Sequence, residues 1–191
     1  MNTYDFDKTI FYPDSSACFY RYCLLHCFPA VIRSVPGTVR MAIRYFFGKL
    51  RAKELKQQLF SFLPDIPDID ETVRAFWAEN EWRIGDWYRK QKRSDDLIVS
   101  ASPYFLLAPI CEKLGVELIA TDMDKHSGVI RGENCHNAEK VRRFYARDPN
   151  GHTEEFYSDS FTDSPMAEIA DRAFLVKKHR VRPWPRLGQK R

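Results

Sequence analysis

The sequence predicts an α/β fold in three layers: a parallel sheet covered by helices on both faces, with an all-helical segment inserted near the start of the chain. Two patterns predict it. From residue 94 onward, short apolar runs alternate with amphipathic stretches, as strands and helices do in parallel sheets. Between residues 12 and 93 the apolar spacing is helical only. A length of 191 residues suffices for one sizeable core and a small appendage.

The elements of the sheet region follow from apolar runs and their lengths. The opening strand is short, because only residues 2–4 precede Asp5. Further strands are expected at 97–99, 116–120, 155–157 and 173–176, and helices at 104–114, 138–146 and 166–170. Sheets of this kind bind ligands at the carboxyl ends of their strands. Asp5, Ser100 and Asp159 each follow an extended run, so we expect all three at that edge.

The helical segment carries recognisable start and stop signals. Asp14 can cap a first helix, and Pro36 can lie in the first turn of a second helix that Gly48 ends. A third helix is expected over residues 51–63, before Pro64. These signals predict three consecutive helices directly after the first strand.

A longer helix is expected from about Asp70. It places one apolar stripe at helical spacing: Val73, Phe76, Trp77, Ile84, Trp87 and Tyr88. The chain must then return to the same sheet at Leu97, which favours a helical unit closing over the sheet rather than a separate helical bundle. The predicted division is a core of residues 1–11 and 94–191, with the helical unit at 12–93.

Composition excludes several classes of protein. Apolar residues make up 44% of the chain, and there is no apolar run of the roughly 18 residues that a membrane span needs. The first residues lead straight into acidic ones, so no signal peptide is expected. Five cysteines without a C-x-x-C pair favour free thiols in a reducing cytoplasm over a zinc site.

The segment Asp5-Phe6-Asp7-Lys8-Thr9 carries the clearest chemistry. Two carboxylates at i and i+2 can divide nucleophilic and acid/base work. Further along lie Ser100 after an apolar strand, Lys140 at the start of a predicted helix, and the pair Asp159 and Asp163. Alone, each has an ordinary explanation as a solvated turn, a strand-end hydroxyl, an exposed lysine or a helix cap. Their occurrence together in this order predicts a phosphoryl-transfer site.

This order resembles the four motifs of the haloacid dehalogenase (HAD) superfamily over nearly the whole chain. The wording Val99-Ser100-Ala101-Ser102-Pro103 and Tyr157-Ser158-Asp159-Ser160 is most similar to the branch that contains the phosphoserine phosphatases. The resemblance implies a Rossmann-like core with a helical cap over the active site. It also implies a Mg²⁺-dependent phosphatase that hydrolyses a phosphomonoester of a small metabolite through an aspartyl-phosphate.

The resemblance also implies roles for the acidic residues. Asp5 is expected to be the nucleophile, and Asp7 the acid that protonates the leaving oxygen and then activates water. The Mg²⁺ ligands are expected to be the Asp5 carboxylate, the Asp7 main-chain carbonyl and Asp159. Asp163 is expected to support the metal waters or orient Lys140.

The same resemblance assigns phosphate binding to the Ser100 hydroxyl, the backbone amide of Ala101 and Lys140. A second D-x-D pattern at Asp122 and Asp124 lacks the threonine and leads into a glycine-containing hairpin, so we interpret it as a solvated strand end.

The substrate is less closely defined. Asp14 falls where phosphoserine phosphatases carry a glutamate that contacts the substrate amino group, but it can equally cap its helix. Thr162 replaces an asparagine of their last motif, so phosphoserine itself does not follow. Tyr20, Arg21, Arg44 and Trp87 are candidate specificity residues. The basic segment 31–60 can be a solvated face, or can attract an anionic substrate or an anionic membrane surface.

Three alternatives stay open at this stage. One is a phosphatase of a phospholipid headgroup phosphate, and another is a catalytically silent binding module with this fold. The third is phosphotransfer to an alcohol. The basic C-terminal tail, 177–191, carries no recognised nucleic-acid motif, so no specific nucleic-acid partner is expected. Both a monomer and a homodimer fit the sequence.

Overall fold

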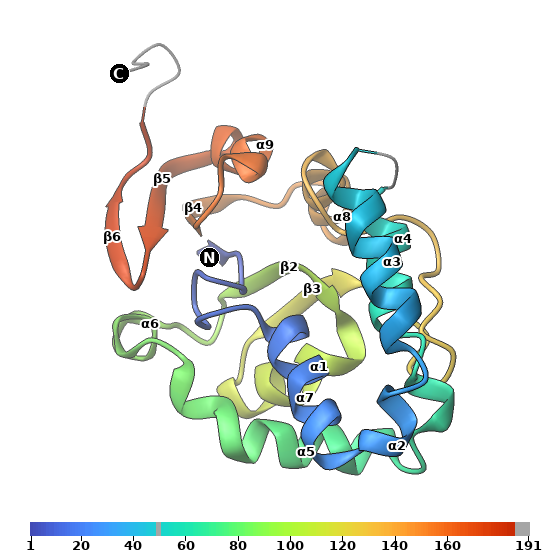
Figure 1. Cartoon of the computed structure of the whole chain (residues 1–191). Helices are drawn as coiled ribbons and strands as arrows, with labels where there is room; N and C mark the ends of the chain where they lie inside the picture. The colour runs from blue at the N-terminus through green and yellow to red at the C-terminus, as the bar shows by residue number, and fades with distance from the viewer. Residues whose placement is uncertain (49–50, 186–191) are drawn as a thin grey trace.

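A six-stranded sheet organises the molecule, for which a computed structural model describes residues 1–48 and 51–185 (Figure 1). Its strands are β1 (Thr3–Tyr4), β2 (Leu97–Pro103), β3 (Glu117–Thr121), β4 (Thr153–Ser158), β5 (Ala170–Lys177) and β6 (Arg180–Pro183). They lie in the order β3-β2-β1-β4-β5-β6, and every neighbouring pair is parallel except β5–β6. The predicted parallel α/β sheet is therefore confirmed. The antiparallel edge strand β6 was not predicted.

The two-residue strand β1 is central despite its length. Thr3 pairs with Leu97 on one side and with Phe156 on the other, and the next residue, Tyr4, is paired in the same way. Both residues of β1 are fully buried. Because the strand ends at Tyr4, Asp5 emerges between the carboxyl ends of β2 and β4.

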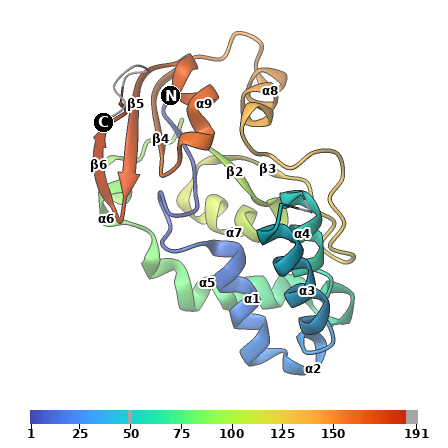
Figure 2. The same ribbon diagram turned by 45° about the horizontal axis from the view of Figure 1, so that its top comes forward.

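Nine α-helices surround the sheet within the described residues (Figure 2). Six precede β2: α1 (Ser15–His26), α2 (Phe28–Val31), α3 (Val35–Phe46), α4 (Ala52–Leu59), α5 (Ile69–Asn80) and α6 (Asp86–Gln91). Three follow it: α7 (Tyr104–Leu114), α8 (Ala138–Arg147) and α9 (Ser164–Ile169). Short 3₁₀ turns occupy Leu63–Asp65, Glu81–Arg83 and Phe161–Asp163.

Alternating side chains of β2 enter two different cores. Ile98 joins the larger cluster, which also holds residues of α1, α5 and α7. Leu97 and Val99 join the smaller cluster, which holds residues of α8 and α9. Burial on both faces is typical of a parallel strand and explains why 97–99 is a continuous apolar run. The first face is covered partly by helices of the inserted segment, since α5 packs on α7 and α1 packs on β2.

The long helix predicted from about Asp70 is wrong in one respect, because it is interrupted. Helix α5 ends at Asn80, and α6 begins only at Asp86. Between them, Ile84 forms an antiparallel bridge with Phe11, and the Gly85 N–H donates to the Ile10 carbonyl at 2.8 Å. These hydrogen bonds to the loop after β1 replace helical ones.

No helix in the part of the chain that the structure describes combines the length and the apolar character needed to cross a membrane. All five cysteines are unpaired. The division into a core and a cap remains a prediction.

Candidate active site

The first predicted aspartate lies in a buried ion-pair network. Asp5 begins directly after β1, where its N–H donates to the Tyr157 carbonyl at 2.8 Å. Lys140, in the first turn of α8 and 1% exposed, donates to Asp5 Oδ1 at 2.7 Å and to Asp163 Oδ2 at 2.8 Å. The Ser158 hydroxyl donates to the same Asp163 oxygen at 2.8 Å. Residues separated by up to 158 positions are thus brought together.

Thr9 links the first and last predicted motifs. Its hydroxyl is fully buried, donates to Asp5 Oδ2 at 3.0 Å and accepts from the Asp159 N–H at 2.9 Å. This side chain therefore fixes the second oxygen of Asp5 and the backbone at Asp159 simultaneously. The threonine of the D-x-D-x-T pattern is a structural bridge between two loops that are far apart in sequence.

Asp7 is held by hydroxyl and amide donors. It accepts from the Ser102 hydroxyl at 2.5 Å and from the Ser15 N–H at 2.6 Å. Ser102 also contacts the Ser16 hydroxyl at 2.9 Å, which ties the end of β2 to the start of α1. The sequence identified Asp7, but it did not indicate that Ser102 would hold it.

These groups surround one cavity of about 440 Å³ at the carboxyl edge of the sheet. Seven of the eight predicted site residues line it: Asp5, Asp7, Asp14, Ala101, Lys140, Asp159 and Asp163. Ser100 is the exception, because it is fully buried and its hydroxyl accepts from the Ser102 N–H at 3.1 Å. Ser102 lines the cavity in its place. The predicted contact of Ser100 with a phosphoryl group remains a prediction.

Burial shifts the pKa values of the two aspartates. Burial raises the pKa of Asp5 to about 7, against the opposing effect of the Lys140 ammonium. Burial also raises the pKa of Asp7 to about 6, with the charge of Asp14 acting in the same direction. Burial lowers the pKa of Lys140, but Asp5 and Asp163 outweigh this and leave it above the usual lysine range. A concentration of buried carboxylates around one lysine is a feature of functional sites rather than of ordinary cores.

The donor set fits a small divalent cation with few protein ligands. Among residues 1–48 and 51–185, no cluster of three or more His, Cys, Asp and Glu side chains is arranged to hold a metal. Mg²⁺, however, is commonly bound through one or two carboxylates and completes its shell with waters and substrate oxygens. Asp5 and Asp159 line the cavity together, and the buried Oδ1 of Asp163 has no hydrogen-bond partner. A cation or its waters would satisfy that oxygen.

Lys56 reaches the same cavity from α4. Its ammonium donates to the Ala101 carbonyl and, at 2.9 Å, to Asn134 Oδ1. Burial lowers the pKa of Lys56 to about 8. The sequence showed it only as one member of a basic segment. A better signal was available, because Lys56 lies at helical spacing from Ala52 and Leu59, on the face that meets the cavity.

Of the remaining predicted positions, some line the cavity and others lie outside it. Asp14 caps α1, since its carboxylate accepts from the Ala17 N–H at 3.0 Å, and it also lines the cavity. The four specificity candidates, Tyr20, Arg21, Arg44 and Trp87, lie outside the cavity lining. The second D-x-D pattern forms a hairpin in which Asp124 accepts from Arg131, in agreement with a solvated strand end.

A parallel sheet with acidic, basic and hydroxyl groups around a cavity at its carboxyl edge places the molecule among Rossmann-like α/β proteins, which bind ligands at this edge. The sequence model of the haloacid dehalogenase-like hydrolase family matches residues 3–168. The chain belongs to this family. The predicted family is confirmed, and with it the prediction of a hydrolase.

Relatives cover most of the chain. Protein CicA of Caulobacter vibrioides is 28% identical over 187 residues, which covers 88% of this chain and 82% of CicA. A crystal structure of a protein with unknown function from Bordetella pertussis Tohama I has a TM-score of 0.78 at 21% identity, and covers 92% of this chain and 89% of its own. A substrate-bound phosphoserine phosphatase complex has a TM-score of 0.58 at 19% identity, with 90% and 82% covered. These two structures show the fold.

Proposed function

We propose that this protein is a Mg²⁺-dependent phosphatase that hydrolyses a small phosphorylated metabolite through an aspartyl-phosphate on Asp5. The observation that carries the proposal is the arrangement of Asp5, Asp7 and Lys140 around one cavity. The buried Asp5 carboxylate lines this cavity and is paired with the buried Lys140 ammonium, which fixes its orientation. A second carboxylate with a pKa of about 6 lines the same cavity.

In the proposed reaction, an Asp5 oxygen attacks phosphorus, and the bond from phosphorus to the ester oxygen breaks. Asp7 gives its proton to that leaving oxygen and later takes a proton from the water that hydrolyses the aspartyl-phosphate. A pKa of about 6 suits both tasks near neutral pH, since the protonated and ionised forms of Asp7 are then both accessible. Ser102 and the Ser15 amide hold Asp7 in place between the two steps.

The Asp5 carboxylate, the Asp7 main-chain carbonyl and Asp159 are the groups that would hold Mg²⁺, with Asp163 supporting its waters. When bound, the cation would neutralise the negative charge that a phosphate brings among carboxylates. Lys140 would add positive charge beside the same group, and its ammonium favours the ionised form of Asp5 against the effect of burial. Ser100 and the amide of Ala101 are proposed to bind the phosphoryl oxygens.

Lys56 adds a second positive charge to the cavity from the helical segment. It comes from α4, whereas the proposed catalytic residues follow the sheet strands or open α8. This favours a cap formed by residues 12–93 that contributes directly to substrate binding. The cavity of about 440 Å³ suits a small phosphorylated metabolite. The unpaired cysteines favour a reducing compartment, in keeping with the predicted cytoplasmic location.

The experiment is phosphate release from p-nitrophenyl phosphate and from a panel of phosphorylated metabolites that includes lipid phosphates, with Mg²⁺ or with EDTA. Asp159→Asn is the test variant, because Asp159 is a proposed metal ligand. Asp124→Asn, in the second D-x-D pattern, is the matched control. Metal-dependent release that Asp159→Asn loses and Asp124→Asn keeps would support the proposal. Folded wild-type protein that is inactive on the whole panel would favour the silent binding module.

A further inference from the structure

Helix α3 exposes most of its large apolar side chains to solvent. Toward α4 it presents a mixed face. The Thr38 hydroxyl lies 3.4 Å from the Gln58 carbonyl, Gly37 lies against the Gln58 side chain, and Met41 and Tyr45 lie on the same side. Away from α4 it presents Ile43 and Phe46, which are 54% and 85% exposed. No residue of α3 is buried. Surface helices ordinarily turn such a stripe toward the core.

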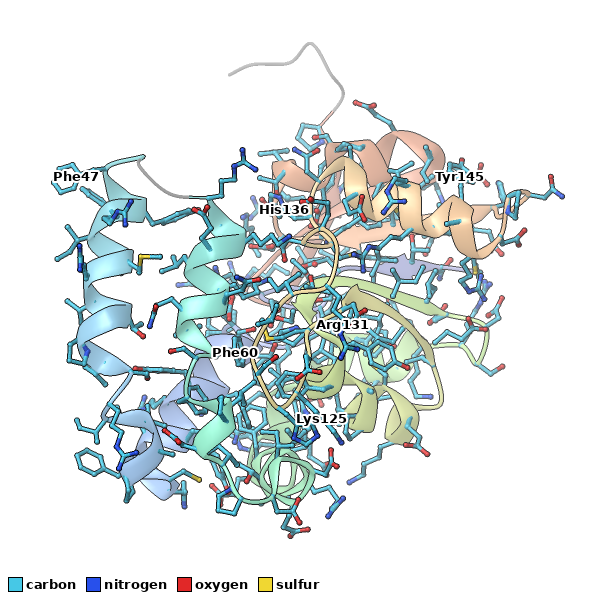
Figure 3. The ribbon with its side chains drawn as sticks, turned by 90° about the vertical axis from the view of Figure 1, so that its right-hand side faces the viewer. Phe47, Phe60, Lys125, Arg131, His136 and Tyr145 are labelled. Carbon is cyan, nitrogen blue, oxygen red and sulfur yellow. The ribbon has the colours of Figure 1, made fainter. Side chains whose placement is uncertain are left out.

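The exposed stripe continues beyond α3. Together with α2 and the residue after α3 it forms an outer face of large exposed apolar side chains: Phe28, Ile32, Val39, Ile43, Phe46 and Phe47. In Figure 3, α4 stands between α3 and the sheet, and Phe47 lies at the far end of α3, pointing away from the rest of the molecule. Groups of large exposed apolar side chains are a feature of interaction sites.

Positive charge flanks this outer face. Arg33, Arg40 and Arg44 are all exposed, and the two on α3 lie one turn apart beside the apolar stripe. The sequence contains no Asp or Glu between Asp14 and Glu54. An apolar stripe bordered by arginines is the pattern of a helix that lies in the plane of a membrane interface.

We propose that the outer face of α2 and α3 docks on an anionic lipid surface. Phe46, Phe47 and Ile43 would enter the boundary between headgroups and acyl chains, while the arginines pair with anionic headgroups. A second copy of this chain is a less suitable partner for the outer face than an anionic lipid surface. Two-fold pairing of α3 would bring arginines of both copies together, and α3 has no carboxylate to neutralise them.

Docking would also bring the cavity near the lipid. Tyr45, on the same helix as Ile43 and Phe46, lines the cavity together with Leu55 and Lys56 of α4. The hairpin of α3 and α4 is therefore both a wall of the cavity and the carrier of the outer face. This inference does not require the proposed function, because lipid binding is measured separately from phosphate release.

The test is co-sedimentation of the full chain with vesicles of phosphatidylcholine containing phosphatidylglycerol, compared with phosphatidylcholine alone. We expect binding to the anionic vesicles and at least tenfold weaker binding to the neutral ones. Ile43→Ser with Phe46→Ser should weaken anionic binding at least tenfold. Arg40→Gln with Arg44→Gln should weaken it roughly fivefold per arginine.

Matched control variants distinguish vesicle binding through the outer face from nonspecific binding by exposed apolar or basic residues elsewhere. Val129→Ser removes an aliphatic side chain that is 51% exposed elsewhere, and Arg180→Gln with Arg182→Gln removes the same charge from β6. Both controls should bind as wild type and, like the test variants, hydrolyse a water-soluble phosphate ester at the wild-type rate. Three results would overturn the proposal: no binding to anionic vesicles, full binding by the Ile43/Phe46 variant, or a solution dimer that this variant converts to monomer.

Discussion

Replacement of Lys56 by methionine is predicted to raise stability while lowering activity. The ammonium of Lys56 is partly buried beside the cavity, and this desolvation lowers its pKa from 10.5 to about 8. Because the folded protein holds this proton less tightly than the unfolded chain, the unfolded chain binds more protons between pH 8 and 10.5. The charged lysine therefore costs folding stability below pH 8, and the cost fades as the pH rises above it.

The expected change in the free energy of unfolding follows from the pKa shift of Lys56. At about 1.4 kcal/mol per pKa unit, the shift amounts to about 3 kcal/mol at pH 7 and about 1 kcal/mol at pH 10. Methionine has a similar length and needs no hydration. One of the two acceptors left behind keeps a donor, because the single hydroxyl proton of Thr121 can reach either the Ala101 carbonyl at 2.7 Å or Asn134 Oδ1 at 2.9 Å. We expect Lys56→Met to raise the free energy of unfolding by up to about 3 kcal/mol at neutral pH.

Urea denaturation at pH 7 and pH 10 measures the stability change, and kcat/KM at pH 7 measures activity. Loss of one charge-assisted hydrogen bond to phosphate predicts a fall in kcat/KM of about 10- to 100-fold. Lys53→Met, on the same helix but outside the cavity lining, is the control and should leave kcat/KM unchanged. A variant that is less stable than wild type at pH 7, or a stability difference that does not change with pH, would contradict this role of Lys56.

Three further predictions concern the buried network and the first helix. Thr9→Val should weaken Mg²⁺ binding and lower kcat at least tenfold, whereas Thr9→Ser should retain both, as a metal titration of the rate would show. Lys140→Met should lower the free energy of unfolding by about 3–5 kcal/mol, because it leaves two buried carboxylates without their cation; urea denaturation that finds no loss would contradict this. Asp14→Ala and Asp68→Ala each remove a helix N-cap and should each lower stability by about 1 kcal/mol. A fall in kcat/KM for Asp14→Ala alone would assign Asp14 to the substrate rather than only to the cap.

The sheet and the site motifs could be predicted because their signals are local. The run at 97–99 is apolar throughout, since its side chains enter two cores, and Lys140 follows a helix start at Ala138. Strand β6 could not be predicted in the same way. All four of its residues are exposed, so no apolar alternation marks it, and its pairing with β5 forms across a tight turn.

The interrupted helix and the role of Lys56 depend on contacts distant in sequence. Ile84 and Gly85 leave the helical path to bond with Phe11 and Ile10, more than 70 residues earlier. Lys56 is set apart from the other basic residues of its segment only because α4 faces the cavity. In a regular strand Ser100 and Ser102 would share one face. The pairing of β2 with β3 changes register between Val99 and Pro103, and the motif alone does not indicate this irregularity or that Ser102 replaces Ser100 in the cavity lining.

The central claim is that Asp5 becomes phosphorylated during turnover. Acid quenching of the enzyme during turnover of p-nitrophenyl phosphate with Mg²⁺, followed by intact-protein and peptide mass spectrometry, tests it most directly. We expect one phosphoryl group on the wild-type protein, located on the peptide that contains Asp5, and none on a folded Asp5→Asn variant that is also inactive. Turnover by Asp5→Asn at the wild-type rate, or a phosphoryl group on another residue, would contradict it.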